Sequence, residues 1–92
     1  MTYRLTLRAL AYEQLQDLRK GDKNTYIKCF DLILAIITEP REGIGKSERL
    51  KGYNDAEVYS RRVNEKDRIV YEIVENESLI EIISCVGHYG DK

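Results

Sequence analysis

The first part of the chain changes from a strand-like to a helix-like pattern of apolar residues. Residues 3–8, with the sequence YRLTLR, alternate apolar and polar side chains, which is the period of a half-buried strand. From 9 to 20 the apolar side chains are spaced to share one face of an amphipathic helix, at Ala11, Leu15 and Leu18 with Tyr12 beside them. The pattern therefore predicts a strand followed by a helix that Gly21 ends.

A second helix is predicted directly after this glycine. Asp22 suits its N-cap, because a carboxylate there can accept the unpaired amide hydrogens of the first turn. Pro40 ends the helix, since proline has no amide hydrogen and disfavours helical backbone in the residue before it. The side chains expected to face the core are Tyr26, Phe30, Ile33, Leu34 and Ile37.

The second half of the chain is rich in valine, isoleucine and tyrosine and predicts strands. Residues 41–51 contain two glycines and no clear period, so they predict an exposed loop that enters a short strand near 49–51. Further strands are predicted at 58–63, 68–74 and 79–86, separated by short polar turns.

One strand, two helices and a meander of strands predict an α+β fold. We expect two helices packed on one face of a mostly antiparallel sheet of four to five strands, with residues 1–92 forming a single domain. The other face of such a sheet is free to bind a partner.

The charge of the chain is small overall but unevenly distributed. A net charge of −1 argues against a generally basic nucleic-acid-binding protein. Residues 41–70, however, carry eight Lys and Arg against six Asp and Glu, so RNA is expected to bind there if it binds at all. We expect the basic residues to gather on the open sheet face and the later acids to lie mostly elsewhere, namely Glu72, Glu75, Glu77 and Glu81.

The two cysteines are expected to carry no chemistry, and the apolar runs are too short to predict a membrane span. Cys29 and Cys85 have no metal-binding spacing and lie in apolar segments, so we expect free buried thiols. The longest apolar run, at 32–37, is far shorter than the roughly 20 residues of a membrane span, and no leader peptide is recognisable. We expect a cytoplasmic protein with no membrane association.

Residues suited to cutting RNA without a metal ion are present in the same half. Such cleavage needs a base for the 2′-hydroxyl proton, cations for the charge that develops on the phosphate, and an acid for the departing 5′-oxygen. Glu48 is the best candidate base, because it lies in a glycine-bounded loop among basic residues. His88 is the only histidine and the best candidate acid. The alternative is that both are ordinary solvated surface residues.

Four ordered motifs in this half resemble one known family. They are GKSERLKG at 45–52, YSRRV at 59–63, RIVY at 68–71 and CVGHY at 85–89. Together they resemble the YoeB/Txe branch of the RelE superfamily, the toxins of bacterial type II toxin–antitoxin pairs. The resemblance covers nearly the whole chain and implies a RelE-like fold and a ribosome-dependent endoribonuclease that cleaves mRNA in the ribosomal A site and so inhibits translation.

The resemblance also implies roles for individual residues. Glu48 would be the general base, His88 the general acid, and Arg68 would stabilise the phosphate in the transition state. Arg62 would support the phosphate or orient Glu48, and Tyr89 would line the site and could stack on a base. Weaker candidates for contacts with the RNA backbone or ribosomal RNA, with ordinary solvated charges as the alternative, are Lys46, Lys51 and Arg61.

The sequence departs from the family pattern in two places. Gly90, Asp91 and Lys92 follow the His-Tyr pair, where related chains tend to stop, which puts in doubt a role for a free carboxylate beside Tyr89. Tyr59 stands where a tryptophan is often found.

The partners implied by the resemblance are a cognate antitoxin, the ribosome with its mRNA, and a second copy in a homodimer. No metal or other cofactor is implied. Two other functions stay open, namely a non-catalytic toxin similar to ParE that inhibits DNA gyrase, and a degenerate member that retains only antitoxin binding. The joint presence of Glu48, Arg62, Arg68 and His88 favours the nuclease over the gyrase inhibitor.

Overall fold

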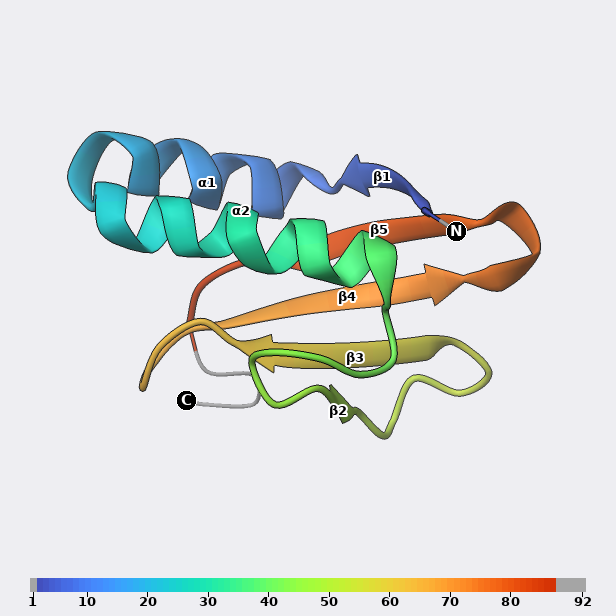
Figure 1. The fold of residues 1–92 in the computed structure, drawn as a ribbon. Helices are drawn as coiled ribbons and strands as arrows, with labels where there is room; N and C mark the ends of the chain where they lie inside the picture. Colours follow the sequence, from blue (N-terminus) through green and yellow to red (C-terminus); the bar gives the residue numbers. More distant parts are fainter. Residues whose placement is uncertain (1, 88–92) are drawn as a thin grey trace.

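The computed structural model describes residues 2–87, over which two helices and a five-stranded sheet are formed (Figure 1). The elements, in chain order, are β1 (Arg4–Leu7), α1 (Ala9–Gly21), α2 (Lys23–Thr38), β2 (Glu48–Arg49), β3 (Glu57–Arg62), β4 (Arg68–Val74), a short 3-10 turn (Glu75–Glu77) and β5 (Leu79–Ser84). The predicted order of elements is confirmed, and the last strand ends two residues earlier than expected.

The strands are arranged in the order β1-β5-β4-β3-β2. β1 runs parallel to β5, and the other three neighbouring pairs are antiparallel. The first and last strands of the described chain therefore lie side by side (Figure 1). The expectation of a mostly antiparallel sheet is confirmed.

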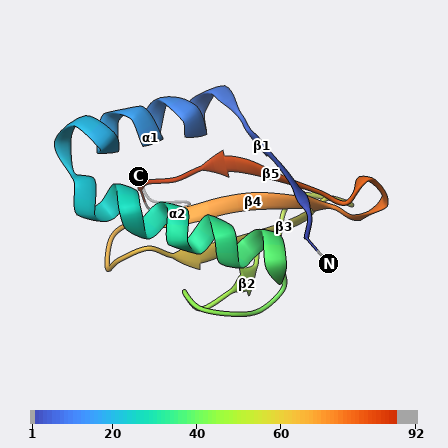
Figure 2. The ribbon, with the colours of Figure 1, turned by 45° about the horizontal axis from the view of Figure 1, so that its top comes forward.

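Both helices lie on one face of the sheet, where they run side by side (Figures 1 and 2). Asp22 caps α2 as predicted, because its carboxylate accepts the Thr25 amide at 3.2 Å and the Thr25 hydroxyl at 2.7 Å. α2 ends at Thr38, two residues before Pro40. None of the helices in the described part of the chain is long and apolar enough to cross a membrane.

The predicted buried stripe of α2 is wrong in part. Ile33 is buried, whereas Phe30 and Leu34 are 37% and 61% exposed. The residues of α2 that the core buries are instead Thr25, Cys29, Leu32, Ile33 and Ile36. Nearly every side chain from 29 to 37 is apolar, so the apolar period did not determine which face of the helix meets the sheet. An exposed apolar surface, consisting of Ile27, Phe30 and Leu34, is the result.

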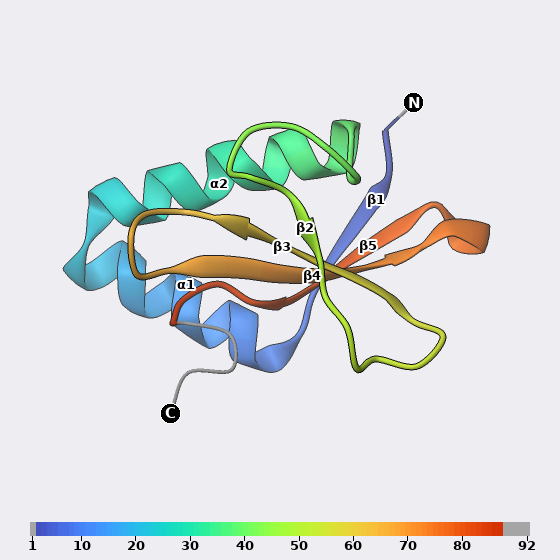
Figure 3. The ribbon, with the colours of Figure 1, turned by 90° about the horizontal axis from the view of Figure 1, so that it is seen from below.

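The strand register determines which side chains occupy the face away from the helices. Residues directly opposite each other on paired strands share a face, and the faces alternate along a strand. Ile69, Tyr71 and Ile73 of β4 belong to the core, so Arg68, Val70 and Glu72 point to the open face. The loop between β2 and β3 lies on this open side, opposite α2 (Figure 3). Arg68, one of the predicted site residues, therefore lies at one end of the open face.

Candidate functional site

Glu48, Ser60 and Arg68 come from three neighbouring strands and meet on the open face. Glu48 on β2 pairs in register with Ser60 on β3, and the guanidinium of Arg68 on β4 reaches both. Arg68 Nη1 lies 3.6 Å from Glu48 Oε1 and donates to Ser60 Oγ at 3.3 Å. The Glu48 side chain is 64% exposed and that of Arg68 is 24% exposed, so a ligand can reach the carboxylate and the cation together.

Arg62 adds a second cation to the same place. It is the last residue of β3, is exposed, and lies directly opposite Arg68 in the register of β3 and β4. Over the part of the chain that the structure describes, no acidic side chain forms an ion pair with Arg62. The structure thus brings Glu48, Arg62 and Arg68 together, and it is Arg68 that contacts the carboxylate.

The candidate role of Arg61 in RNA contact is wrong, because its side chain is fully buried. Adjacent residues of a strand point to opposite faces, so Arg61 and Arg62 cannot both lie on the open side. Arg61 pairs in register with the core residue Ile69, and its guanidinium donates to the hydroxyl of Tyr71 and to backbone carbonyls. It is therefore inaccessible to RNA.

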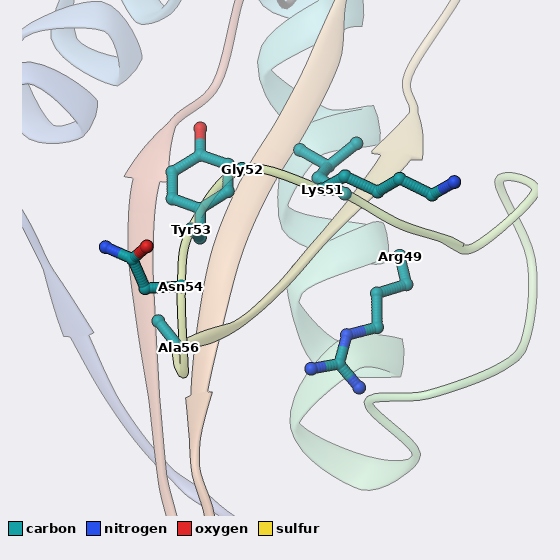
Figure 4. A pocket seen from close by; sticks show the side chains of 7 residues that line it. Arg49, Lys51, Gly52, Tyr53, Asn54 and Ala56 are labelled. Carbon is teal, nitrogen blue, oxygen red and sulfur yellow. The ribbon is translucent and has the colours of Figure 1, made fainter.

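Lys46 and Lys51 are both exposed, on either side of β2. Among residues 2–87 no carboxylate pairs with either ammonium group. Lys51 also lines a hollow of about 480 Å³ in the loop from β2 to β3, together with Arg49, Leu50, Gly52, Tyr53, Asn54 and Ala56. In the close-up, Arg49 and Lys51 extend to the opposite side of the loop from Tyr53 and Asn54 (Figure 4).

The expected separation of the later acids from the open face is only partly right. Glu72 and Glu81 pair with each other across β4 and β5 on that face, where Arg8 binds both at 3.3 and 3.2 Å. They do not surround the site, because Glu72 is four residues along β4 from Arg68, or about 13 Å at the usual rise of a strand. Glu75 and Glu77 lie in the 3-10 turn beyond β4.

His88 and Tyr89 lie outside the described residues, so their predicted roles stay predictions. The structure does show how the chain is held just before them. The buried carboxylate of Asp67 accepts the amide of Gly87 at 3.0 Å, and the side chain of Gln14 accepts the amide of Cys85 at 2.7 Å. Asp67 also directly precedes Arg68 and was not predicted to contribute, because nothing in its spacing distinguishes it from other turn aspartates.

The prediction of free buried thiols is confirmed for both cysteines. Burial raises the pKa of the Cys29 thiol to about 11 and that of Cys85 to about 12. Such thiols stay protonated and unreactive near neutral pH. In the described residues, no group of three or more His, Cys, Asp and Glu side chains is arranged to hold a metal ion.

Comparisons with known proteins agree on one family. The family described as "YoeB-like toxin of bacterial type II toxin-antitoxin system" matches residues 8–89. The toxin YoeB of Synechocystis sp. is 42% identical over 71 residues, which make up 77% of this chain and 79% of that protein. The toxin YoeB of Escherichia coli is 38% identical over 71 residues, covering 77% and 81% of the two chains.

Solved structures show the same relationship in three dimensions. A YoeB/ParE toxin from Agrobacterium tumefaciens superposes with a TM-score of 0.86 at 30% identity, over 94% of this chain and 99% of that one. The Staphylococcus aureus YoeB, solved as a dimer, gives a TM-score of 0.84 at 33% identity, over 97% and 100%. The RelE-like fold predicted from the sequence is thereby confirmed, and the chain belongs to the YoeB-like toxin family of bacterial type II toxin–antitoxin systems.

Proposed function

We propose that this toxin is a ribosome-dependent endoribonuclease that cleaves mRNA in the A site and so stops translation. The observation that carries the proposal is the contact of Glu48 with Arg68 at 3.6 Å on an open sheet face, with Arg62 directly opposite Arg68. A carboxylate beside two guanidinium groups can supply a base for the 2′-hydroxyl proton and cations for the charge that develops on the phosphate. Membership of the family supports the same activity.

In this reaction Glu48 takes the proton of a 2′-hydroxyl, whose oxygen attacks the adjacent phosphorus. The bond from phosphorus to the 5′-oxygen breaks, and a 2′,3′-cyclic phosphate is formed. His88 is proposed to protonate the departing 5′-oxygen, so that the proton count balances. Arg68 can turn from Glu48 to a non-bridging phosphate oxygen, where guanidinium groups bind in a charge-assisted manner. Arg62 would bind the same phosphate from the neighbouring strand.

The remaining basic and aromatic residues are proposed to hold the RNA around this centre. Lys46 and Lys51 are exposed on either side of β2, where they can contact the backbone of the message or of ribosomal RNA. Tyr89 is proposed to stack on a base, a contact worth about 1 to 3 kcal/mol in single-strand binders. No metal or cofactor enters the proposed reaction.

A cognate antitoxin is the proposed protein partner. Staphylococcus aureus YoeB forms a heterotetrameric complex with YefM and has also been solved as a dimer. By analogy, this chain is proposed to bind an antitoxin and to be capable of forming a homodimer. The exposed apolar surface of Ile27, Phe30 and Leu34 on α2 offers area for such contacts. We further propose that the toxin acts in the cytoplasm, where its ribosomal target is found.

The proposal is tested by mixing the purified toxin with ribosomes programmed with a defined mRNA. Primer extension should detect cleavage in the A site, which is lost when Glu48→Ala and His88→Ala are combined. Intact message with the unmodified toxin, or unchanged cleavage by the double variant, would contradict the proposal. Growth arrest through a DNA-damage response with intact message would indicate a gyrase inhibitor instead, and antitoxin binding without any arrest would indicate a degenerate member.

A further inference from the structure

Arg61 is a buried cation whose guanidinium is hydrogen-bonded by the backbone carbonyls of one loop. Its side chain is 0% exposed, and the guanidinium donates to the carbonyls of Glu39, Glu42 and Ile44, the last two at 3.0 and 3.4 Å. No carboxylate in the described residues pairs with it. Burying a charge without such hydrogen bonds would be strongly unfavourable, so the loop and the arginine depend on each other.

These carbonyls are well placed to bind a cation. Glu39 is the C-cap of α2, and the C-terminal end of a helix carries partial negative charge and unpaired carbonyls. Tyr71 completes the arrangement, because its hydroxyl accepts from Arg61 Nε at 3.1 Å and donates to the carbonyl of Pro40 at 2.7 Å. The Tyr71 ring stacks on Tyr59 of β3, with ring centres 6.1 Å apart. Two core side chains, Arg61 and Tyr71, thus bind four backbone carbonyls between residues 39 and 44.

The loop passes so close to the Arg61 guanidinium and to β3 that it has no room for a side chain at Gly43 or Gly45. Gly43 has a φ of +141°, and a Cβ there would lie 2.8 Å from Arg61 Nη1. Gly45 has a φ of +86°, and a Cβ there would lie 3.0 Å from the carbonyl oxygen of Arg62. The carbonyl of Gly45 also accepts the Arg62 amide. The two glycines are therefore the residues that permit the close approach of loop and strand.

Only Lys46 and Ser47 separate this restrained loop from Glu48. β2 itself has two residues, and a strand so short has too few cross-strand bonds to fix its position alone. The hydroxyl of Ser47 donates to the carbonyl of Arg41 at 3.1 Å. The segment between this loop and Glu48 is therefore also held in place. The position of Glu48 against Arg68 thus depends on how firmly residues 39–45 are held.

We propose that Arg61 is a positioning residue, which holds the loop 39–45 through its carbonyls and thereby keeps Glu48 within reach of Arg68. Arg61 touches neither RNA nor the reacting atoms. Its effect on cleavage rests on the proposed nuclease function, whereas its effect on the loop does not.

Two variants test the loop separately from the rest of the fold. Arg61→Lys retains the charge but cannot reach three carbonyls and a hydroxyl with one ammonium group. Tyr71→Phe retains the ring and removes only the hydroxyl, so it keeps the core packing. Arg19→Lys on the exposed side of α1 is the matched control. By amide hydrogen exchange, the Arg62 and Leu50 amides should exchange at least tenfold faster in both variants, while the amides between β4 and β5 keep their rates.

Cleavage on programmed ribosomes provides the second measurement. Both variants should lower kcat about tenfold or more and change KM for the ribosome less than twofold, and Arg19→Lys should match the unmodified toxin. The proposal is overturned by a wild-type kcat in both variants, or by faster exchange spread evenly over β4 and β5, which would mean a general role in stability. If the unmodified toxin cleaves nothing, the nuclease proposal fails, and the exchange rates alone decide whether Arg61 holds the loop.

Discussion

Arg62 and Arg68 lie directly opposite each other across the hairpin of β3 and β4, both on the open face of the sheet. Like charges in directly opposed positions destabilise a sheet. Glu48 offsets the charge of Arg68 alone, at 3.6 Å. A locally unfavourable pair of this kind is expected where binding requires it, since stability and function conflict at such sites.

Arg62→Gln should therefore separate stability from activity. Removing one of two opposed cations should leave the free energy of unfolding unchanged or raise it by up to about 1 kcal/mol. Cleavage should fall by about 10²-fold, because one stabilising donor to the phosphate is lost. Urea denaturation and the ribosome assay measure the two effects. A variant that loses both stability and activity would show that Arg62 is mainly structural.

Glu48→Gln should abolish most of the activity at little cost in stability. The ion pair with Arg68 is exposed on the Glu48 side, and such pairs contribute about 0 to 1 kcal/mol. Loss of a general base typically lowers the rate by about 10² to 10⁴-fold. Glu65→Gln, in the neighbouring exposed turn, is the control and should keep full cleavage. Equal rates for the two variants would exclude Glu48 as the base.

The Asp22 cap of α2 should contribute to the loss of stability at acidic pH. Hydrogen bonds from the Thr25 side chain and amide lower the pKa of Asp22. A lowered folded-state pKa stabilises the protein above the unfolded value of about 3.9, and this contribution is lost as the pH falls through the folded value. Asp22→Asn retains a capping side chain without the titrating group. Thermal unfolding from pH 6 to pH 2 should show a shallower acid decline in the variant, and identical declines would contradict the assignment.

The two buried thiols should limit stability at alkaline pH. Their folded-state pKa values, about 11 for Cys29 and about 12 for Cys85, lie above the unfolded value of about 8.5. Their contribution is complete below pH 8.5 and is lost as the pH rises toward 11 to 12. The unfolding free energy should therefore fall less steeply over this range in a variant with both cysteines changed to alanine. A thiol reagent at pH 8 should label the native protein slowly and the urea-unfolded protein at once.

Asp67 should hold the end of the described chain, at Gly87, against the turn between β3 and β4. Its carboxylate accepts from the Gly87 amide and the Asn64 side chain at 3.0 and 3.2 Å, so Asp67→Ala leaves two donors without an acceptor. The expected loss in unfolding free energy is about 1 to 3 kcal/mol, measured by urea denaturation. Because Gly87 precedes the proposed acid His88, cleavage should fall as well. Asp55→Ala, exposed in the loop from β2 to β3, should change neither quantity.

The sequence predicted the elements well because their signals are local. The strand at β1, the cap at Asp22 and the stop at Pro40 depend on neighbouring residues alone, and each was confirmed, although Leu5 of β1 is exposed rather than half-buried. The buried face of α2 was not predictable in the same way, because an almost uniformly apolar helix is oriented by the surfaces that pack on it. Phe30 and Leu34 consequently lie outside the core.

The candidate site shows the same limit. Glu48, Arg62 and Arg68 were identified from motifs, but their meeting depends on the register of β2, β3 and β4. Arg61 was misjudged because a basic residue beside another basic residue gives no indication of which face it occupies. Once the register is known, its pairing with Ile69 places it in the core. The same register also places Ser60 beside Arg68, from which its hydroxyl accepts a hydrogen bond.

The parallel pairing of β1 with β5 bears on how the toxin is made. Arg4 of β1 pairs with Leu79 of β5, so β1 can form these backbone hydrogen bonds only after residues up to β5 have been synthesised. Contacts between such distant parts of a sequence form late and slowly. A nascent chain therefore cannot complete its sheet while its own ribosome is still adding β5. Synthesis of β5 thus delays the moment at which a newly made toxin can carry out the proposed cleavage on ribosomes.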